Sequence, residues 1–193
     1  MEIKDKLIKY IVAVENFIPE RIHEKLQETL NNNLFNFKEA GLSSVKKENY
    51  FDSNVRKTQT FPLDNLNSSM TVVHWSNLFG TYLMQAGHRY KEETNTDFEA
   101  TITDMQILKY FKNGFYKKHI DSGIHIPRTL SFVYFINDNF KGGELSFELP
   151  SNEVIKFEVK KNKLIIFPSN FLYPHKVVPV EEGVKYSVVA WAS

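Results

Sequence analysis

Hydrophobic positions recur at helical spacing in the first half of the chain. Segment 18–34 includes Pro19 near its start, a run of asparagines near its end, and a large aliphatic residue at every fourth position between them. These aliphatic residues are Ile22, Leu26, Leu30 and Leu34. Because such spacing places apolar side chains on one face of a helix, the segment predicts an amphipathic helix.

A longer helical stripe lies within segment 68–94, where Ser68 or Ser69 can cap the start. Its apolar positions are Trp75, Leu78, Phe79, Tyr82, Leu83, Ala86 and Tyr90. A stripe of large aromatic and aliphatic side chains predicts a helix that packs on a core. Segment 43–67, between the two helices, mixes charge with Asn and Ser and predicts a loop with one or two short strands.

Short runs rich in Val, Ile, Phe and Tyr replace the helical pattern after residue 99, and Gly, Asn, Asp or Pro separates them. The predicted strands lie within 100–111, 114–121, 128–137, 143–149, 153–160, 162–169, 175–180 and 184–193. Strands this closely spaced predict a closed antiparallel sandwich or barrel with the N-terminal helices outside it. The expected fold class is mainly β with flanking helices (α+β). We expect one compact unit, with a helical support region over 1–98 and a β core over 99–193.

Composition narrows the classes of function. Of the 193 residues, 42% are hydrophobic, and 24 Lys and Arg balance 23 Asp and Glu. This balance gives no electrostatic reason to expect a nucleic-acid partner or a membrane surface. There is no cysteine, so a metal site would use His, Asp or Glu. The first residues resemble a mature N-terminus, and no apolar run approaches the ~20 residues of a membrane span. We therefore expect a cytoplasmic monomer or homodimer.

His119 and Asp121 lie two residues apart in the predicted strand 114–121, so both should project to one side of it. His175, at the start of a later predicted strand, is a candidate third ligand. Two histidines and one carboxylate suit non-haem Fe(II), which keeps open positions for O2 and a co-substrate. The competing interpretation is a solvated strand edge at which His119 and Asp121 form an incidental hydrogen bond.

The last predicted strand carries a lysine in an apolar setting. Lys185, Ser187, Val189 and Trp191 share one face, and the other face is also largely apolar. A lysine buried there needs an anionic partner, and this strand has no acidic residue. A carboxylate from outside the protein, held by Lys185 and Ser187 beside Trp191, satisfies that need. The alternative is that Lys185 lies at an edge and extends into solvent.

Together these features resemble the prolyl 4-hydroxylase-like branch of the Fe(II)/2-oxoglutarate-dependent dioxygenases. The resemblance is collinear from about residue 104 to 191. It rests on "QILKYFKNGFYKKHID", "RTLSFVYFIN", "GGELSF", "IIFPS", His175 followed ten residues later by Lys185-x-Ser187, and the closing Trp191. It implies a double-stranded β-helix core of the jelly-roll or cupin type.

The resemblance also implies a role for each matching residue. The implied iron ligands are His119, Asp121 and His175; the implied 2-oxoglutarate contacts are Tyr110, Lys185 and Ser187; and the implied substrate contacts are Tyr116, Arg128 and Trp191. Because the loop 122–127 is short for this branch, the implied role of Arg128 depends on how that loop folds. His125, within the loop, is an alternative substrate contact.

The implied activity is hydroxylation of a C–H bond, with 2-oxoglutarate converted to succinate and CO2. Fe(II), 2-oxoglutarate and O2 are the implied cofactor and co-substrates, with ascorbate as a further candidate, and Asp121 favours hydroxylation over halogenation. The expected substrate is a prolyl residue in a peptide or protein. Two alternatives stay open: a hydroxylase of a free amino acid or small molecule, and a non-catalytic cupin-like binding module.

Overall fold

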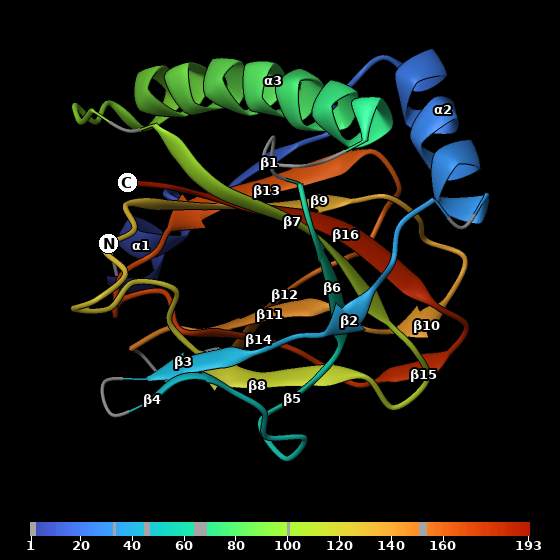
Figure 1. The fold of residues 1–193 in the computed structure, drawn as a ribbon. Helices are drawn as coiled ribbons and strands as arrows, with labels where there is room; N and C mark the ends of the chain where they lie inside the picture. The colour runs from blue at the N-terminus through green and yellow to red at the C-terminus, as the bar shows by residue number, and fades with distance from the viewer. Residues whose placement is uncertain (1–2, 33, 45–46, 64–68, 100, 151–153) are drawn as a thin grey trace.

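Two antiparallel sheets face one another, and helices cover the outer side of the larger sheet (Figure 1). The computed structural model describes residues 3–32, 34–44, 47–63, 69–99, 101–150 and 154–193. The helices are α1 (Ile3–Ile8), α2 (Glu20–Asn31) and α3 (Met70–Thr94). The strands before α3 are β1 (Val12–Val14), β2 (Lys38–Glu39), β3 (Leu42–Ser44), β4 (Lys47–Tyr50), β5 (Arg56–Lys57) and β6 (Gln59–Pro62). Those after it are β7 (Ile102–Tyr110), β8 (Phe115–His119), β9 (Leu130–Phe135), β10 (Lys141–Gly142), β11 (Leu145–Glu148), β12 (Val154–Phe157), β13 (Lys163–Pro168), β14 (His175–Val177), β15 (Val180–Glu182) and β16 (Lys185–Ala192).

The larger sheet has the order β1-β13-β9-β16-β7-β6-β2, and the smaller has the order β12-β11-β14-β8-β5. All eight strands predicted after residue 99 are present, which confirms a mainly β fold with flanking helices. The first 98 residues also contribute strands to both sheets, because β1, β2 and β6 join the larger sheet and β5 joins the smaller one. The division into a support region and a core remains a prediction.

Helix α2 begins after Pro19 and ends at Asn31, where the asparagine run starts. Its buried residues are His23, Leu26 and Leu30. The expectation that Leu34 belongs to the apolar stripe is wrong: Leu34 lies beyond the helix end and is exposed. Asparagine ends the helix early because its side chain competes for backbone hydrogen bonds.

Helix α3 has both predicted features, a serine cap and an aromatic stripe. The Ser69 hydroxyl accepts a hydrogen bond from the Val72 N–H, and Ser68 lies outside the described residues. Trp75, Phe79, Leu83, Ala86 and Tyr90 are buried against the larger sheet, and Leu78 and Tyr82 are half-buried beside them. Among the described residues, no helix combines the length and hydropathy that crossing a bilayer requires.

Segment 43–67 contains more strand than the sequence predicts. Strands β4, β5 and β6 lie wholly within it. Strand β6 pairs along β7 and β5 pairs with β8, so each extends an existing sheet. Strands this short carry too little periodicity to be recognised, because their pairing partners define them.

Apolar side chains form separate cores on the two faces of the larger sheet. One lies between the helices and that sheet and includes Leu26, Phe79, Phe132 and Val188. The other face packs against the smaller sheet through Phe147 and Phe167, among other residues. Successive side chains of β16 point to opposite faces of the sheet, which explains this division. Val188 and Ala190 face the helices. Lys185, Ser187 and Trp191 face a cavity between the sheets.

A buried polar network ties α2 to the turn before β13. Asn162 has a left-handed conformation (φ 59°), which asparagine tolerates, and its side chain bonds the backbone of Ile18 in both directions. The Tyr134 hydroxyl donates to Asn162 Oδ1 (3.2 Å) and lies 2.6 Å from His23 Nδ1. Because a carboxamide oxygen can only accept, His23 Nδ1 is the donor to the tyrosine oxygen.

Replacing Tyr134 with Phe should therefore leave the buried His23 Nδ1 without a partner and remove one of the two donors to Asn162 Oδ1. We expect the free energy of unfolding to fall by about 2 kcal/mol. Urea denaturation followed by circular dichroism measures the change. The matched control is Tyr82→Phe, which removes a hydroxyl from a half-buried ring outside this network. Equal losses for the two variants would contradict the role assigned to the network.

Candidate metal centre and adjoining cavity

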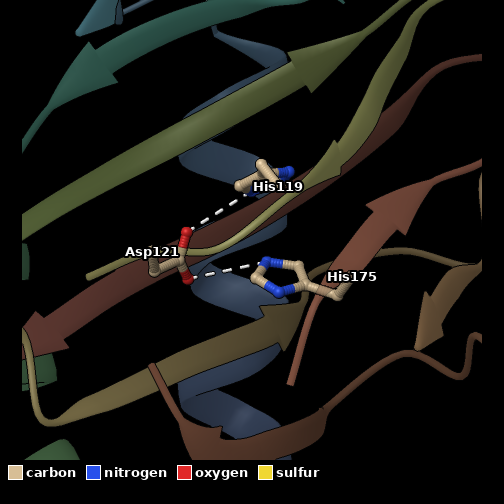
Figure 2. Close-up of side chains that lie close together, drawn as sticks. All are labelled: His119, Asp121 and His175. Carbon is tan, nitrogen blue, oxygen red and sulfur yellow. Dashed lines mark ion pairs between the residues drawn. The ribbon is translucent and has the colours of Figure 1, made fainter. Parts of the chain in front are cut away.

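Strand pairing brings His119 and His175 together. His119 is the last residue of β8, His175 is the first residue of β14, and the two are direct partners across these antiparallel strands. Asp121 follows in the bend beyond β8 and turns back toward both imidazoles, as Figure 2 shows. The expectation that Asp121 lies within the strand is wrong, because β8 ends two residues earlier. The three side chains nevertheless converge.

The ligand atoms of the three side chains lie within 4.8 Å of one another. His119 Nε2 is 3.3 Å from Asp121 Oδ1, and His175 Nε2 is 3.5 Å from Oδ2. The Nδ1 atoms point away, at 2.8 Å from the Lys117 carbonyl and 3.1 Å from the Tyr173 carbonyl respectively. A carbonyl can only accept, so each Nδ1 carries a proton and each Nε2 is the atom left for a metal.

The charges around Asp121 favour a bound cation. Burial raises the pKa of Asp121, but His175, His119 and the hydroxyl of Ser131 outweigh burial and hold this pKa well below its usual range. Burial lowers the pKa of His175 to about 4, so its imidazole is neutral near pH 7. A neutral His175 protonated at Nδ1 turns the Nε2 lone pair toward the carboxylate. Two lone pairs facing one another are repulsive unless a cation lies between them, so the donor set fits a divalent metal.

Aromatic rings and hydroxyls fix the orientation of the three ligands. The Tyr116 ring stacks on the His119 ring at 3.6 Å, and the Arg56 guanidinium lies over Tyr116 at 4.6 Å from the ring centroid. Ser131 donates to Asp121 Oδ2 at 2.6 Å and also contacts the Ser169 hydroxyl. Sequence reasoning assigned no role to Arg56, Ser131 or Ser169, although Ser131 and Ser169 lie in the stretches "RTLSFVYFIN" and "IIFPS" that resemble the family's.

A cavity of about 430 Å³ adjoins the three ligands between the two sheets. It brings together the nine residues predicted for the site: His119, Asp121, His175, Tyr110, Lys185, Ser187, Tyr116, Arg128 and Trp191. His125 is exposed in the loop and does not line this cavity. The solvated-edge interpretations do not fit, because the side chains of His119 and Asp121 are 17% and 9% exposed and Lys185 is 1% exposed.

Lys185 is buried among neutral groups. Its Nζ donates to the Gly143 carbonyl at 2.6 Å and lies 5.4 Å from the Tyr110 ring centroid. Burial lowers the pKa of Lys185 to about 7, partly opposed by Glu144. No carboxylate of the described residues lies within ion-pair distance of it. A Cβ atom on Gly143, where φ is +71°, would meet the lysine stem at 3.2 Å, so glycine at this position also leaves space for the lysine.

The two cavity tyrosines keep their hydroxyl protons. Tyr110 is the cross-strand partner of Lys185, and burial raises its pKa. Burial also raises the pKa of Tyr116, to about 12. Both hydroxyls can therefore donate hydrogen bonds into the cavity at neutral pH.

The short loop 122–127 closes on itself. Gly123 and Ile126 exchange backbone hydrogen bonds, and the Arg128 N–H donates to the Ser122 hydroxyl. The loop thereby delivers Arg128 to the cavity, where its guanidinium lies 3.7 Å from the Trp191 ring centroid. Arg128 also pairs with Asp104, a cavity residue that sequence reasoning missed.

Residues 105–193, which contain the three ligands and Lys185, match the family model of the 2OG-Fe(II) oxygenase superfamily. This match, over somewhat less than half of the chain, bears out the resemblance found in the sequence, and the donor set described above suits the Fe(II) that the family's name gives.

Two relatives match part of the chain, each named as a PKHD-type hydroxylase, from Synechococcus sp. strains JA-2-3B'a(2-13) and JA-3-3Ab. Each is 30% identical over 84 residues, which cover 39% of this chain and 36% of the relative. The chain thus matches little more than a third of the length of these oxygenase relatives.

Solved structures of prolyl hydroxylases share the fold. A Trichoplax adhaerens prolyl hydroxylase, solved with a hypoxia inducible factor oxygen degradation domain peptide fragment, superposes with a TM-score of 0.73 at 20% identity, covering 95% of this chain and 83% of that one. A Pseudomonas putida prolyl-4-hydroxylase superposes with a TM-score of 0.68 at 17% identity, covering 95% and 91%. These likenesses confirm the jelly-roll fold.

Replacing His119 with Ala should abolish metal binding while leaving the fold intact, because it removes one of three ligands. Anaerobic calorimetric titration with Fe(II) measures the affinity, and circular dichroism checks the fold. The matched control is His125→Ala, which removes an exposed histidine six residues away and should keep the affinity within about twofold. Equal loss in both variants would contradict the assignment of the ligands.

Proposed function

We propose that the protein is an Fe(II)- and 2-oxoglutarate-dependent dioxygenase that hydroxylates a prolyl residue in a peptide or protein. The observation that carries this proposal is the shared cavity, in which a two-histidine, one-carboxylate set lies beside a buried lysine with no described acidic partner. A metal set alone would support many chemistries. The lysine adds a place for a dianionic co-substrate in the same cavity.

In this proposal His119 Nε2, His175 Nε2 and one oxygen of Asp121 hold Fe(II). The bound metal, with 2-oxoglutarate and O2, supplies the oxidant that places a hydroxyl on a C–H bond while succinate and CO2 leave. Ser131 and the two Nδ1 hydrogen bonds keep the ligands oriented. The surrounding rings of Phe147 and Phe167 exclude water from the His175 side.

Lys185 is assigned to the far carboxylate of 2-oxoglutarate, with hydroxyls of Tyr110 and Ser187 as further donors. All three lie on the cavity face of the β7–β16 pair, since Lys185 opposes Tyr110 and Ser187 follows on the same face of β16. A bound carboxylate would restore the charge balance that burial disturbs at Lys185. This assignment explains why a lysine is tolerated at 1% exposure.

The substrate end is assigned to Tyr116, Arg128 and Trp191, which line the same cavity as the metal set, with Trp191 six residues beyond Lys185 along β16. The Trichoplax enzyme was solved with a peptide fragment, and the Pseudomonas enzyme is named a prolyl-4-hydroxylase. These names, together with the predicted branch, support a peptidyl-proline substrate. A free amino acid or small molecule is the alternative that the experiment below must separate from it.

Replacing Lys185 with Met should weaken 2-oxoglutarate binding by about 2 kcal/mol, roughly thirtyfold, with metal affinity unchanged. Calorimetry with 2-oxoglutarate on the Fe(II)-loaded, oxygen-free protein measures it. The control is Lys163→Met, because Lys163 is also buried but pairs with Glu15 on another side of the fold.

The same titration should depend on pH. Binding a carboxylate raises the pKa of Lys185 above its value of about 7 in the free protein. The affinity for 2-oxoglutarate is therefore highest below pH 7 and falls as the pH rises above it, by up to about tenfold per pH unit. Lys185→Arg should flatten this dependence, since arginine stays protonated. A flat profile in the unchanged protein would contradict the role of Lys185.

An aerobic assay tests the function. The protein with Fe(II) and 2-oxoglutarate should release succinate when given proline-containing peptides, and the peptide should gain one oxygen atom by mass spectrometry. His119→Ala should abolish both signals. Oxygen gain on free amino acids alone would favour the small-molecule alternative. Tight binding of Fe(II) and 2-oxoglutarate without turnover of any candidate would favour a non-catalytic binding module.

A further inference from the structure

Asp104 and Trp191 are direct cross-strand partners on β7 and β16, and both line the substrate side of the cavity. Arg128 reaches across both. Its Cζ lies over the Trp191 ring, 3.7 Å from the ring centroid, and its Nη2 donates to Asp104 Oδ2 at 3.0 Å. The carboxylate and the indole together define one position for the arginine.

A chain of side-chain hydrogen bonds holds Asp104 in turn. Gln106 Nε2 lies 3.3 and 3.4 Å from the two carboxylate oxygens, and Gln106 Oε1 accepts from the Thr60 hydroxyl at 2.8 Å. Thr60 belongs to β6 and Gln106 to β7, so the chain crosses two strands of the larger sheet before it reaches Arg128. Asp104 is therefore oriented before any substrate arrives.

This arrangement changes what Arg128 offers a substrate. Its charge is compensated by Asp104, and its side chain is 15% exposed. The indole ring of Trp191 is covered on one face by the same guanidinium. The substrate end thus presents a flat, charge-compensated surface where an unpaired arginine would present a free cation.

We propose that Asp104 is a positioning residue that locks Arg128 over Trp191 and makes the substrate end favour an uncharged group over an anionic one. This inference rests on the proposed function for its meaning in catalysis, and the lock itself can be measured without turnover.

The fluorescence of Trp191 reports the lock directly. In a Trp75→Phe background Trp191 is the only tryptophan, since the chain has two. Asp104→Ala should free Arg128, expose the indole and raise the acrylamide quenching constant by about twofold or more. Asp104→Glu should restore most of the protection. The control is Asp97→Ala, which removes a fully exposed carboxylate paired with Lys91.

Binding measurements separate this inference from the rest of the site. Asp104→Ala should keep the affinities for Fe(II) and 2-oxoglutarate within about twofold, because Asp104 lies on the substrate side. Unchanged quenching in Asp104→Ala would overturn the lock, whatever the assays of turnover show. Raised quenching with no turnover of any substrate would uphold the lock and count against the proposed function alone.

Matched peptides test the preference for uncharged groups. The pair carries Glu or Gln beside the target proline, and kcat/KM is measured for each. The ratio of Glu to Gln peptide should rise at least about fivefold in Asp104→Ala, through KM, since the freed Arg128 can pair with the carboxylate. An unchanged ratio, with quenching raised, would overturn the assignment of specificity to Asp104.

Discussion

The antiparallel pairing of β8 with β14 is the constraint on which the rest of the site depends. It places His119 opposite His175, although the two are far apart along the chain. Each imidazole is held through Nδ1 by a carbonyl of its own strand segment, so the pairing also orients both Nε2 atoms. A shift of one residue in either strand would turn one ring to the opposite face of the smaller sheet, and the three ligands would no longer lie together.

The larger sheet separates the apolar core on one of its faces from the polar cavity on the other. The face toward α2 and α3 carries a continuous apolar core, which supplies stability that the site cannot. The opposite face carries Lys185 and lines the cavity beside the three ligands. Burial there disfavours the protonated, charged form of Lys185. A buried lysine and a buried carboxylate each cost free energy there unless an anion pairs with the lysine and a cation binds the carboxylate. The strand β16 serves both faces at once because its side chains alternate.

Much of this arrangement could be predicted from sequence, and the failures share one physical cause. Periodicity located α3 and the eight later strands, and the order of motifs singled out His119, Asp121, His175 and Lys185, which the structure brings to one cavity. One or two short strands were predicted in segment 43–67, but β4, β5 and β6 could not be located or counted, because pairing partners, not local periodicity, define them. Asp104 and Arg56 escaped detection for the same reason, since a charged residue on a strand resembles a solvated one until the register shows what it faces. Leu34 shows the converse, an apolar residue that continues the pattern after the helix has ended.

The shortness of the loop after Asp121 has a structural consequence at the substrate end. A tight turn between Gly123 and Ile126 leaves little chain to form a wall there, and it brings Arg128 within reach of both Asp104 and Trp191. The wall that a longer loop would provide is replaced by a guanidinium stacked on an indole and paired with a carboxylate. Such a stack is rigid because its charge pair and its aromatic contact act on one planar group. In the proposal made above, the selectivity of this cavity depends on Asp104 of β7, Trp191 of β16 and Arg128, two residues before β9, and the loop contributes chiefly by placing Arg128.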